Sequence, residues 1–451
     1  MLFSARTARR ALAVRALAGA GAVALCVALP AQAHAFAGGG SNPADAFTTK
    51  TPYHPAANAA SYQKAPKGFS PVFTENVSRH GSRTMSDSGD GDTLYALWQQ
   101  AKDAGALTNR GQSLGPAIQQ LVADNAADGW GLLTSVGRSE MKTTATRMVK
   151  RLPGLFDGKH GGVDVVAASQ ERTVDSADQY VAGLEAASPR ITPLVGATRT
   201  DDDLLYFHKA KANADYTAYT KSAQVADAEA KATDQPQTYR LATAALERSF
   251  TREFVAGLSD ADKVSAAEAL YALVQNVPDL GRDTAVDMSP YMTAEQAAWF
   301  GYLDDVTSFY ENGPAFAGSD ITYKMAKVLL DDVFAQLDAK RAGTSNLAAE
   351  LRFTHAEEIF PLEALLGLKG ASEQLPADEL YTYADSPFRG AKVAPMGANL
   401  QWDLYSNGKQ YLVRLLVNEK QTAFKTGCTP VKPGSYFYSL DELESCYGYQ
   451  G

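Results

Sequence analysis

The sequence predicts an α/β fold, in which a mixed and mostly parallel sheet is sandwiched by helices and carries an inserted all-α cap domain. Short apolar runs typical of buried strands alternate with stretches of helical periodicity on either side of the middle of the chain. The middle itself, residues 201–344, is rich in alanine, lysine and aspartate and shows long helical periodicity. Strands that alternate with helices are typical of a sheet covered by helices on both faces.

Three candidate strands each end in a loop that carries charged side chains. The strands are Val72–Val77, Val163–Ala168 and Leu347–Thr354. Ligands of such sheets bind just beyond the carboxyl ends of the strands. We therefore expect the chemistry of this protein in the loops that follow these strands.

The spacing of apolar residues predicts helices around these strands. The predicted helices cover 94–101, 115–125, 139–152, 176–184 and 359–368. The acidic, glycine-rich segment Asp87–Asp92 is interpreted as a turn. Near the C-terminus, Leu400–Tyr405 and Tyr411–Asn418 flank the pair Asn407-Gly408, and Asn-Gly between apolar runs predicts a β-hairpin.

The first 35 residues have the pattern of a secretory signal peptide. Four arginines precede the apolar stretch Ala16–Leu29, and small-x-small cleavage sites follow it. This stretch is shorter than the roughly 20 residues that span a membrane, so we expect a secreted protein without a membrane span. Residues 36–66, rich in Ala, Gly, Ser, Asn and Pro, are interpreted as a flexible lead-in. The α/β domain would then consist of 67–200 and 345–451.

Charge and cysteine content narrow the class of partner. Removal of the signal peptide takes four arginines and no acid, which leaves 38 basic and 51 acidic residues and a net charge of −13. A nucleic-acid partner is therefore not expected. Only Cys428 and Cys446 remain, and in a secreted chain they predict a disulfide.

The segment Arg79-His80-Gly81-Ser82-Arg83 directly follows the first strand candidate. Phosphoryl transfer needs a nucleophile, positive charge on the phosphate oxygens and a proton for the leaving group. A neutral imidazole is a competent nucleophile, and guanidinium groups match the geometry of phosphate. His80 is therefore the candidate nucleophile, with Arg79 and Arg83 as phosphate ligands.

The loops after the other two strands supply residues that would complete this site. Arg172 offers a third guanidinium group, His355 another donor, and Glu357 a carboxylic acid that would protonate the leaving alkoxide and later deprotonate water. Each has a structural alternative: Arg172 could pair with Glu171 or Asp175, and Glu357 could be an acid at a helix N-terminus, favoured by the helix dipole. Their joint occurrence at strand ends favours a common site.

No metal or cofactor is expected. The sequence contains no Gly-x-x-x-x-Gly-Lys-Ser/Thr phosphate loop, no His-Glu-x-x-His and no Gly-x-Ser-x-Gly. The cluster of Asp87, Asp90 and Asp92 suggests a calcium site, but the glutamate at the twelfth position of an EF-hand loop is missing. These acids are therefore interpreted as part of a solvated turn.

The motifs resemble those of a known family. Arg79-His80-Gly81-Ser82-Arg83 matches the signature Arg-His-Gly-x-Arg of the histidine phosphatase superfamily, and His355-Ala356-Glu357 is similar to its acid phosphatase/phytase branch, most of all to multiple inositol polyphosphate phosphatases. The resemblance implies that His80 forms a phosphohistidine, that Arg79, Arg83, Arg172 and His355 bind the phosphate, and that Glu357 donates the proton without a metal. It also implies that the helical domain shapes substrate choice.

The expected function is that of a secreted phosphomonoesterase acting on a small-molecule phosphate ester, an inositol polyphosphate such as phytate. One alternative is a broad-specificity acid phosphatase for sugar phosphates or small phosphomonoesters, because the segment 84–92 is acidic and contains no base. Basic residues elsewhere could line the cleft: Arg138, Lys142, Lys209, Lys211, Arg389 and Lys392. A second alternative is a non-catalytic phosphate-binding protein, which would need the arginines but neither His80 nor Glu357.

Overall fold

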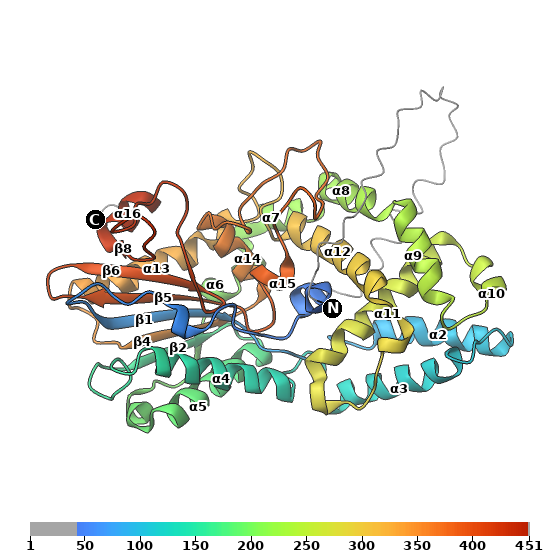
Figure 1. Cartoon of the computed structure of the whole chain (residues 1–451), viewed down its shortest axis with the longest axis horizontal. Helices are drawn as coiled ribbons and strands as arrows, with labels where there is room; N and C mark the ends of the chain where they lie inside the picture. Colours follow the sequence, from blue (N-terminus) through green and yellow to red (C-terminus); the bar gives the residue numbers. More distant parts are fainter. Residues whose placement is uncertain (1–42, 450–451) are drawn as a thin grey trace.

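The computed structural model of the chain describes residues 43–449 and places an eight-stranded mixed sheet at its centre (Figure 1). The strands are β1 (Ser70–Arg79), β2 (Val163–Ala167), β3 (Arg199–Thr200), β4 (Ala349–Thr354), β5 (Asn399–Ser406), β6 (Tyr411–Val417), β7 (Lys420–Thr422) and β8 (Tyr438–Ser439). Their order is β3-β2-β4-β1-β5-β6-β7, and β8 pairs with β6. Strands β3, β2, β4 and β1 are parallel, whereas β5 to β8 pair antiparallel. The predicted fold class is confirmed.

Helices cover both faces of the parallel part of the sheet. Helices α4 (Ser135–Arg151) and α5 (Glu171–Ala187) lie on one face, and α13 (Lys327–Arg341) and α14 (Ala356–Leu365) on the other (Figure 1). The alternation of side chains along a strand accounts for both layers. Val165 belongs to the core under α4 and α5, whereas its neighbour Val166 belongs to the opposite core.

A second group of helices lies beyond the end of the sheet. It contains α2 (Gly89–Asp103), α3 (Gly111–Asp128), α8 (Ala223–Thr233), α9 (Pro236–Leu246), α10 (Arg252–Ala256), α11 (Asp260–Leu280) and α12 (Ala294–Glu311). Helices α2 and α3 precede the predicted cap in the sequence, yet α2 packs on α11 of the cap. Conversely, α13 belongs to the predicted cap range but covers the sheet. The packing of apolar faces, rather than the order along the chain, decides whether a helix belongs to the helical group or covers the sheet.

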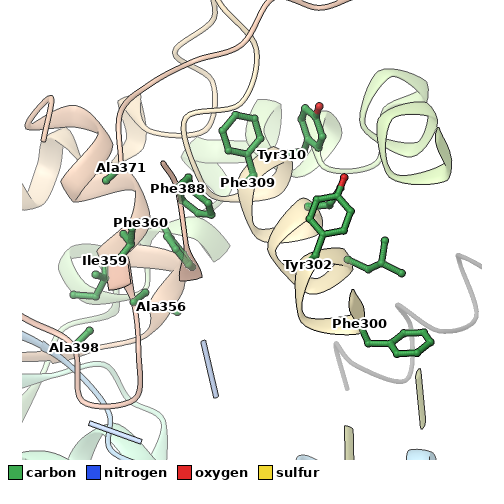
Figure 2. Close-up of a cluster of buried hydrophobic side chains, with 14 of the residues drawn as sticks. Phe300, Tyr302, Phe309, Tyr310, Ala356, Ile359, Phe360, Ala371, Phe388 and Ala398 are labelled. Atoms are coloured by element: carbon green, nitrogen blue, oxygen red, sulfur yellow. The ribbon is translucent and has the colours of Figure 1, made fainter. Parts of the chain in front are cut away.

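One continuous apolar core joins the helical part to the sheet. Figure 2 shows Phe309 of α12 beside Phe388, which lies next to Phe360 of α14. The ring of Phe388 lies 5.5 Å from the rings of both Phe309 and Phe360, measured between centroids. Aromatic pairs at this spacing each contribute about 0.5–1.5 kcal/mol beyond the area they bury. The helical part is therefore held firmly beside the carboxyl ends of the strands.

The prediction of a turn over Asp87–Asp92 was wrong for most of the segment. It is a turn only at its beginning, because helix α2 begins at Gly89. Asp90 and Asp92 lie in its first turn, where the helix dipole favours negative charge. Gly91 permits the close approach of α2 to α3, since a Cβ atom there would lie 2.4 Å from a methyl group of Val122.

The lead-in was predicted to be flexible, but its described part is ordered. The 3₁₀-helix η2 (Pro43–Lys50) packs against α12 and against the short helix α15 (Gly390–Val393). Further along, the hydroxyl of Tyr53 donates a hydrogen bond to Glu419 at 2.9 Å. Low hydrophobicity favoured a flexible segment, but contacts with distant elements hold it. The predicted signal peptide, residues 1–35, lies outside the described residues.

Two predictions for the C-terminal region are confirmed. Strands β5 and β6 form the hairpin expected around Asn407-Gly408, and Gly408 has a φ of +85°. Cys428 and Cys446 form the expected disulfide, with their Cα atoms 5.5 Å apart, and it ties the loop before β8 to α16 (Leu440–Tyr447). Within the described part of the chain, no helix is long and apolar enough to cross a membrane.

Replacement of both cysteines by alanine should lower the free energy of unfolding by roughly 3 kcal/mol, because the crosslink closes a loop of 18 residues in the unfolded chain. Denaturant melts of the double variant and of the oxidised wild type measure this difference. The reduced wild type is the matched control and should behave like the double variant. Equal stability of all three proteins would contradict the expectation.

Candidate active site

The loops after β1, β2 and β4 meet at the carboxyl ends of the strands. The backbone N–H of His80 donates to the carbonyl of Thr354 at 2.9 Å, which joins the first loop to the third. The rings of His80 and His355 lie 5.5 Å apart between centroids. Arg172, in the first turn of α5 after β2, places Nη2 3.2 Å from Nδ1 of His355. The structure therefore brings predicted residues from all three loops into one site.

His80 is held in the form that a nucleophile needs. Its ring is 3% exposed, and Nδ1 lies 2.9 Å from the carbonyl oxygen of Gly81. A carbonyl oxygen only accepts, so Nδ1 carries the proton and Nε2 keeps its lone pair. Burial lowers the pKa of His80 well below its ordinary value, and the positive charges of Arg172 and Arg79 lower it further. These effects favour the neutral, nucleophilic form of the imidazole.

Arg79 and Arg83 each donate hydrogen bonds through Nη1, whereas Nε of each has no partner among the described residues. Arg79 donates through Nη1 to the carbonyls of Thr49 and Ala394, both at 2.6 Å. Arg83 donates through Nη1 to the carbonyl of Thr84 at 2.8 Å. Burial lowers the pKa of Arg79 to about 10 and, with the neighbouring charge of Arg172, that of Arg83 to about 9, so both stay positive at neutral pH.

Several buried nitrogen atoms of this site have no hydrogen-bond partner among the described residues. They are Nε of Arg79, Arg83 and Arg172, and Nε2 of His355. A buried donor without a partner costs about 1–3 kcal/mol, and more when the group is charged. A phosphate group would satisfy such donors through charge-assisted hydrogen bonds.

Helix α14 supplies the predicted proton donor. His355 is the residue before its first turn, and Glu357 is half-buried in that turn. The Glu357 carboxylate is the strongest of the neighbouring charges that act on the pKa of Arg79 and of Arg172, and it raises both, against the larger effect of burial. The acid therefore faces the same cluster of guanidinium groups as His80.

Helix α4 supports the loop from behind through a residue that the sequence did not reveal. The carboxylate of Glu140 accepts hydrogen bonds from the backbone N–H of Ser82 at 2.7 Å and from its hydroxyl at 2.9 Å. It also accepts from the backbone N–H of Tyr53 at 2.7 Å. Gly81 lies against Gly137, where a Cβ atom would be only 2.7 Å from a backbone oxygen. Nothing in the local sequence distinguishes Glu140 from an exposed helical acid.

A model of the histidine phosphatase superfamily (branch 2) matches residues 73–418. The chain belongs to this superfamily. It is therefore a histidine-type phosphomonoesterase, as its motifs predicted.

Known relatives of this histidine phosphatase cover most of its length. The multiple inositol polyphosphate phosphatase 1 of Gallus gallus is 25% identical over 417 residues, which are 86% of this chain and 85% of the relative. The structure of a Bifidobacterium longum multiple inositol polyphosphate phosphatase in complex with inositol hexasulfate has a TM-score of 0.83 and 30% identity, and covers 89% of this chain and 97% of that one. The phytase from D. castellii shares the fold, with a TM-score of 0.67 and 18% identity over 90% of this chain and 85% of that one.

The site of this histidine phosphatase contains a lysine that sequence reasoning missed. Lys50 ends the 3₁₀-helix η2 and is 7% exposed. Burial lowers its pKa, as do the positive charges of Arg83 and Arg79, while Asp279 acts in the opposite direction. Lys50 is therefore close enough to Arg83 and Arg79 to feel their charges, and its surroundings disfavour the protonated form until an anion binds. Its segment resembled a disordered lead-in by composition, so no local signal pointed to it.

The basic residues proposed as cleft-lining have mixed outcomes. Arg138 pairs with Asp175 at 3.1 Å. Arg389 stacks 3.7 Å from the ring centroid of Tyr383 and donates to three carbonyl groups of its own loop, so its guanidinium group has a structural role. The side chains of Lys142, Lys209, Lys211 and Lys392 are exposed.

Three carboxylates lie close enough together to share a metal ion in the described part of the chain. Glu75 of β1, Glu350 of β4 and Asp332 of α13 surround the buried guanidinium group of Arg352. Arg352 Nη2 lies 2.7 Å from Glu350, and burial raises the pKa of Glu350 to about 7. Arg352 thus already supplies the cation of this cluster, which lies inside the sheet layer rather than in the phosphate site.

The contact between Gly81 and Gly137 predicts a steep effect of one methyl group. In Gly137→Ala, the new Cβ would lie 2.1 Å from the carbonyl oxygen of Ser82 and displace the loop. We expect kcat/KM to fall on the order of tenfold to a hundredfold, as for a displacement of about 1 Å. Steady-state kinetics with p-nitrophenyl phosphate measure it. Gly154→Ala, where the new methyl group meets nothing within 4 Å, is the matched control; equal activity of the two variants would contradict this account.

The positive charges around His80 predict a shift of its titration. Because Arg172 lowers the pKa of His80, Arg172→Gln should move that pKa upward, toward the ordinary value of 6.5. The neutral, nucleophilic form would then be lost at a higher pH than in the wild type. Titration of isotope-labelled imidazole groups by NMR measures the shift. Lys150→Gln, which removes an exposed charge at the far end of α4, should leave the titration unchanged. A downward or absent shift in Arg172→Gln would refute the electrostatic explanation.

Proposed function

We propose that this protein hydrolyses inositol polyphosphates through a phosphohistidine intermediate on His80. The observation that carries the proposal is the set of buried nitrogen atoms without partners around His80: Nε of Arg79, Arg83 and Arg172, and Nε2 of His355. A non-catalytic phosphate-binding site would account for these donors. It would not account for an imidazole held neutral with a free lone pair, or for a carboxylate beside the cluster.

The proposed reaction has two steps. Nε2 of His80 attacks phosphorus, the bond from phosphorus to the ester oxygen breaks, and Glu357 gives its proton to the departing alkoxide. A water molecule then loses a proton to the Glu357 carboxylate and attacks phosphorus, the N–P bond breaks, and inorganic phosphate leaves. Such acid catalysis typically contributes about 10²–10⁴ in rate. The arginines stabilise the charge on the phosphate oxygens in both steps.

Relatives support inositol polyphosphates as the substrate class. The Bifidobacterium longum enzyme, with which this chain shares 30% identity over 89% of its length, was solved with inositol hexasulfate, a polyanion. In this chain, buried Lys50 lies within the electrostatic reach of Arg83 and Arg79; a second phosphate of the same substrate would favour the protonated form of Lys50 and accept its hydrogen bonds.

One observation favours the alternative of a broad-specificity phosphatase for small esters. Acidic side chains lie near Lys50. The carboxylates of Asp279 and Asp304 raise the pKa of Lys50, and Lys50 in turn lowers the pKa of Asp90. Burial raises the pKa of Asp90 to about 7, with Asp87 adding to the effect. At higher pH these acids would repel additional phosphate groups, so a small substrate would be favoured there.

We also propose that the protein is secreted. The N-terminal pattern of basic residues, apolar stretch and small-residue cleavage sites supports export. The disulfide between Cys428 and Cys446 is typical of an oxidising compartment.

Comparison of three substrates tests the proposed specificity: inositol hexakisphosphate, glucose 1-phosphate and p-nitrophenyl phosphate. The wild type should have the highest kcat/KM for inositol hexakisphosphate. Lys50→Met should lower that value roughly tenfold or more, since a charge-assisted hydrogen bond contributes about 1.5–3 kcal/mol, and should change turnover of p-nitrophenyl phosphate far less.

The controls use the same three substrates. Lys150→Met removes an exposed lysine of α4 and should match the wild type. His80→Ala is the blank and should turn over none of them. Equal kcat/KM of the wild type for all three substrates would refute the inositol assignment and favour the broad-specificity phosphatase.

A further inference from the structure

A buried ion pair ties the inserted segment to the helix of the proton donor. Nδ1 of His208 contacts the carboxylate of Glu358 through a short hydrogen bond. Both side chains are buried, with 3% of His208 and none of Glu358 exposed. Glu358 follows Glu357 directly in the first turn of α14. The pair therefore adjoins the predicted proton donor along α14 and takes no part in the reaction steps described above.

The other carboxylate oxygen of Glu358 is held as well. Thr354 Oγ1 lies 3.1 Å from Glu358 Oε2 and 2.6 Å from the carbonyl oxygen of Leu205. Thr354 is the last residue of β4, whereas Leu205 and His208 belong to the inserted range. Both ends of the Glu358 carboxylate thus connect the first turn of α14 to the same segment.

This segment, residues 201–209, is termed the strap. It contains α6 (Asp202–Leu205) and the 3₁₀-helix η5 (Phe207–Lys209). At its beginning, the carboxylate of Asp202 accepts hydrogen bonds from the backbone N–H and the hydroxyl of Ser169, at 2.7 and 2.6 Å. The strap is therefore fastened to the loop after β2 as well as to β4 and α14.

The strap presents Tyr206 to the catalytic centre. The ring of Tyr206 lies 5.0 Å from that of His355 and 4.8 Å from that of His208, between centroids. Burial raises the pKa of Tyr206, as does the Glu357 carboxylate, whereas Arg172 lowers it. Tyr206 is therefore close to the phosphate ligands and the proton donor, and the ring of His208 packs edge-on against it.

The charges around His208 favour its protonated form and therefore the ion pair with Glu358. Burial alone would lower the pKa of His208, but the carboxylate of Glu358 and the hydrogen bond to it raise the pKa, as does Glu357. The other groups that face it are His355, Tyr206 and Lys209, and Lys209 acts in the opposite direction. An imidazolium and a carboxylate, buried together and hydrogen-bonded, are costly to separate, because either one alone would be an uncompensated buried charge.

We propose that His208 and Glu358 are positioning residues, which fix the first turn of α14 so that Glu357 stays directed at the leaving group. The proposal rests on the role of Glu357 as proton donor. Proton transfer depends on placement within hydrogen-bond reach of the ester oxygen. Loss of the pair would free the strap and α14 to shift relative to each other. The main consequence would be weaker acid catalysis, in addition to lower stability.

A purely structural pair would behave differently. It would lower the melting temperature, and it would lower turnover of all substrates by the same factor. A positioning pair acts through the proton donor, so its loss lowers kcat/KM most for substrates whose leaving group needs a proton. Glycerol 2-phosphate releases an alkoxide and needs one, whereas p-nitrophenyl phosphate releases a stabilised phenolate and depends on it far less.

The experiment compares kcat/KM for these two substrates in the full-length protein. His208→Asn should reduce the value for glycerol 2-phosphate roughly tenfold more than the value for p-nitrophenyl phosphate, a part of the range that a general acid contributes. Glu358→Gln keeps groups that can bond to Thr354 and His208 but removes the compensating charge, so its substrate ratio should fall between those of the wild type and His208→Asn. Glu357→Gln removes the proton donor itself and should change the ratio of the two kcat/KM values most.

Asp403→Asn is the matched control. Asp403 is fully buried and pairs with Arg414 at 2.7 Å inside the sheet, at β5 and β6, away from the strand ends. It should lower the melting temperature without changing the substrate ratio. If His208→Asn lowers both substrates equally, or leaves both unchanged, the positioning role is refuted. If Glu357→Gln itself leaves the ratio unchanged, the proton-donor role fails and the positioning role with it.

Discussion

The structure depends on burying positive charge beside a neutral imidazole. Guanidinium groups taken out of water cost several kcal/mol unless they are paired or hydrogen-bonded. Arg79 and Arg83 are each anchored to backbone carbonyls, and Arg172 to His355, while Nε of each arginine stays unpaired. Burial and the same charges lower the pKa of His80 and so favour its neutral form. One electrostatic arrangement thus prepares both the phosphate site and the nucleophile.

Much of the surrounding fold holds that arrangement in place. Glu140 fixes the loop through Ser82, and the two glycines at 81 and 137 allow α4 to approach it at backbone distance. The lead-in provides a carbonyl for Arg79 at Thr49 and adds Lys50. A chain with an acidic overall composition therefore contains a local cationic site, because tertiary contacts, and not composition, determine where charge concentrates.

The catalytic centre and its surroundings come from different parts of the chain. His80 and His355 follow parallel strands at the centre of the sheet, so the sheet itself sets their separation. Tyr206 and His208 come from the strap, and Lys50 comes from the lead-in. These segments cross the strand ends without belonging to the sheet. In this enzyme the candidate catalytic residues come from the loops and helices that follow the strands, and the added segments surround them.

The amino-acid sequence was sufficient to predict the fold class, the hairpin at Asn407-Gly408, the disulfide, and His80, Arg172 and Glu357 as candidate site residues. These follow from local patterns: apolar runs, turn residues and charged residues placed after strands. The remaining features became visible only in the folded chain. Nothing local marks Glu140 as buried, the lead-in as ordered or α2 as a partner of α11, because each depends on contacts with residues far away in the chain. His208 and Glu358 are separated by 150 residues, and a pairing over that distance leaves no periodicity or spacing to read. Burial and charge compensation exist only once the fold brings such residues together.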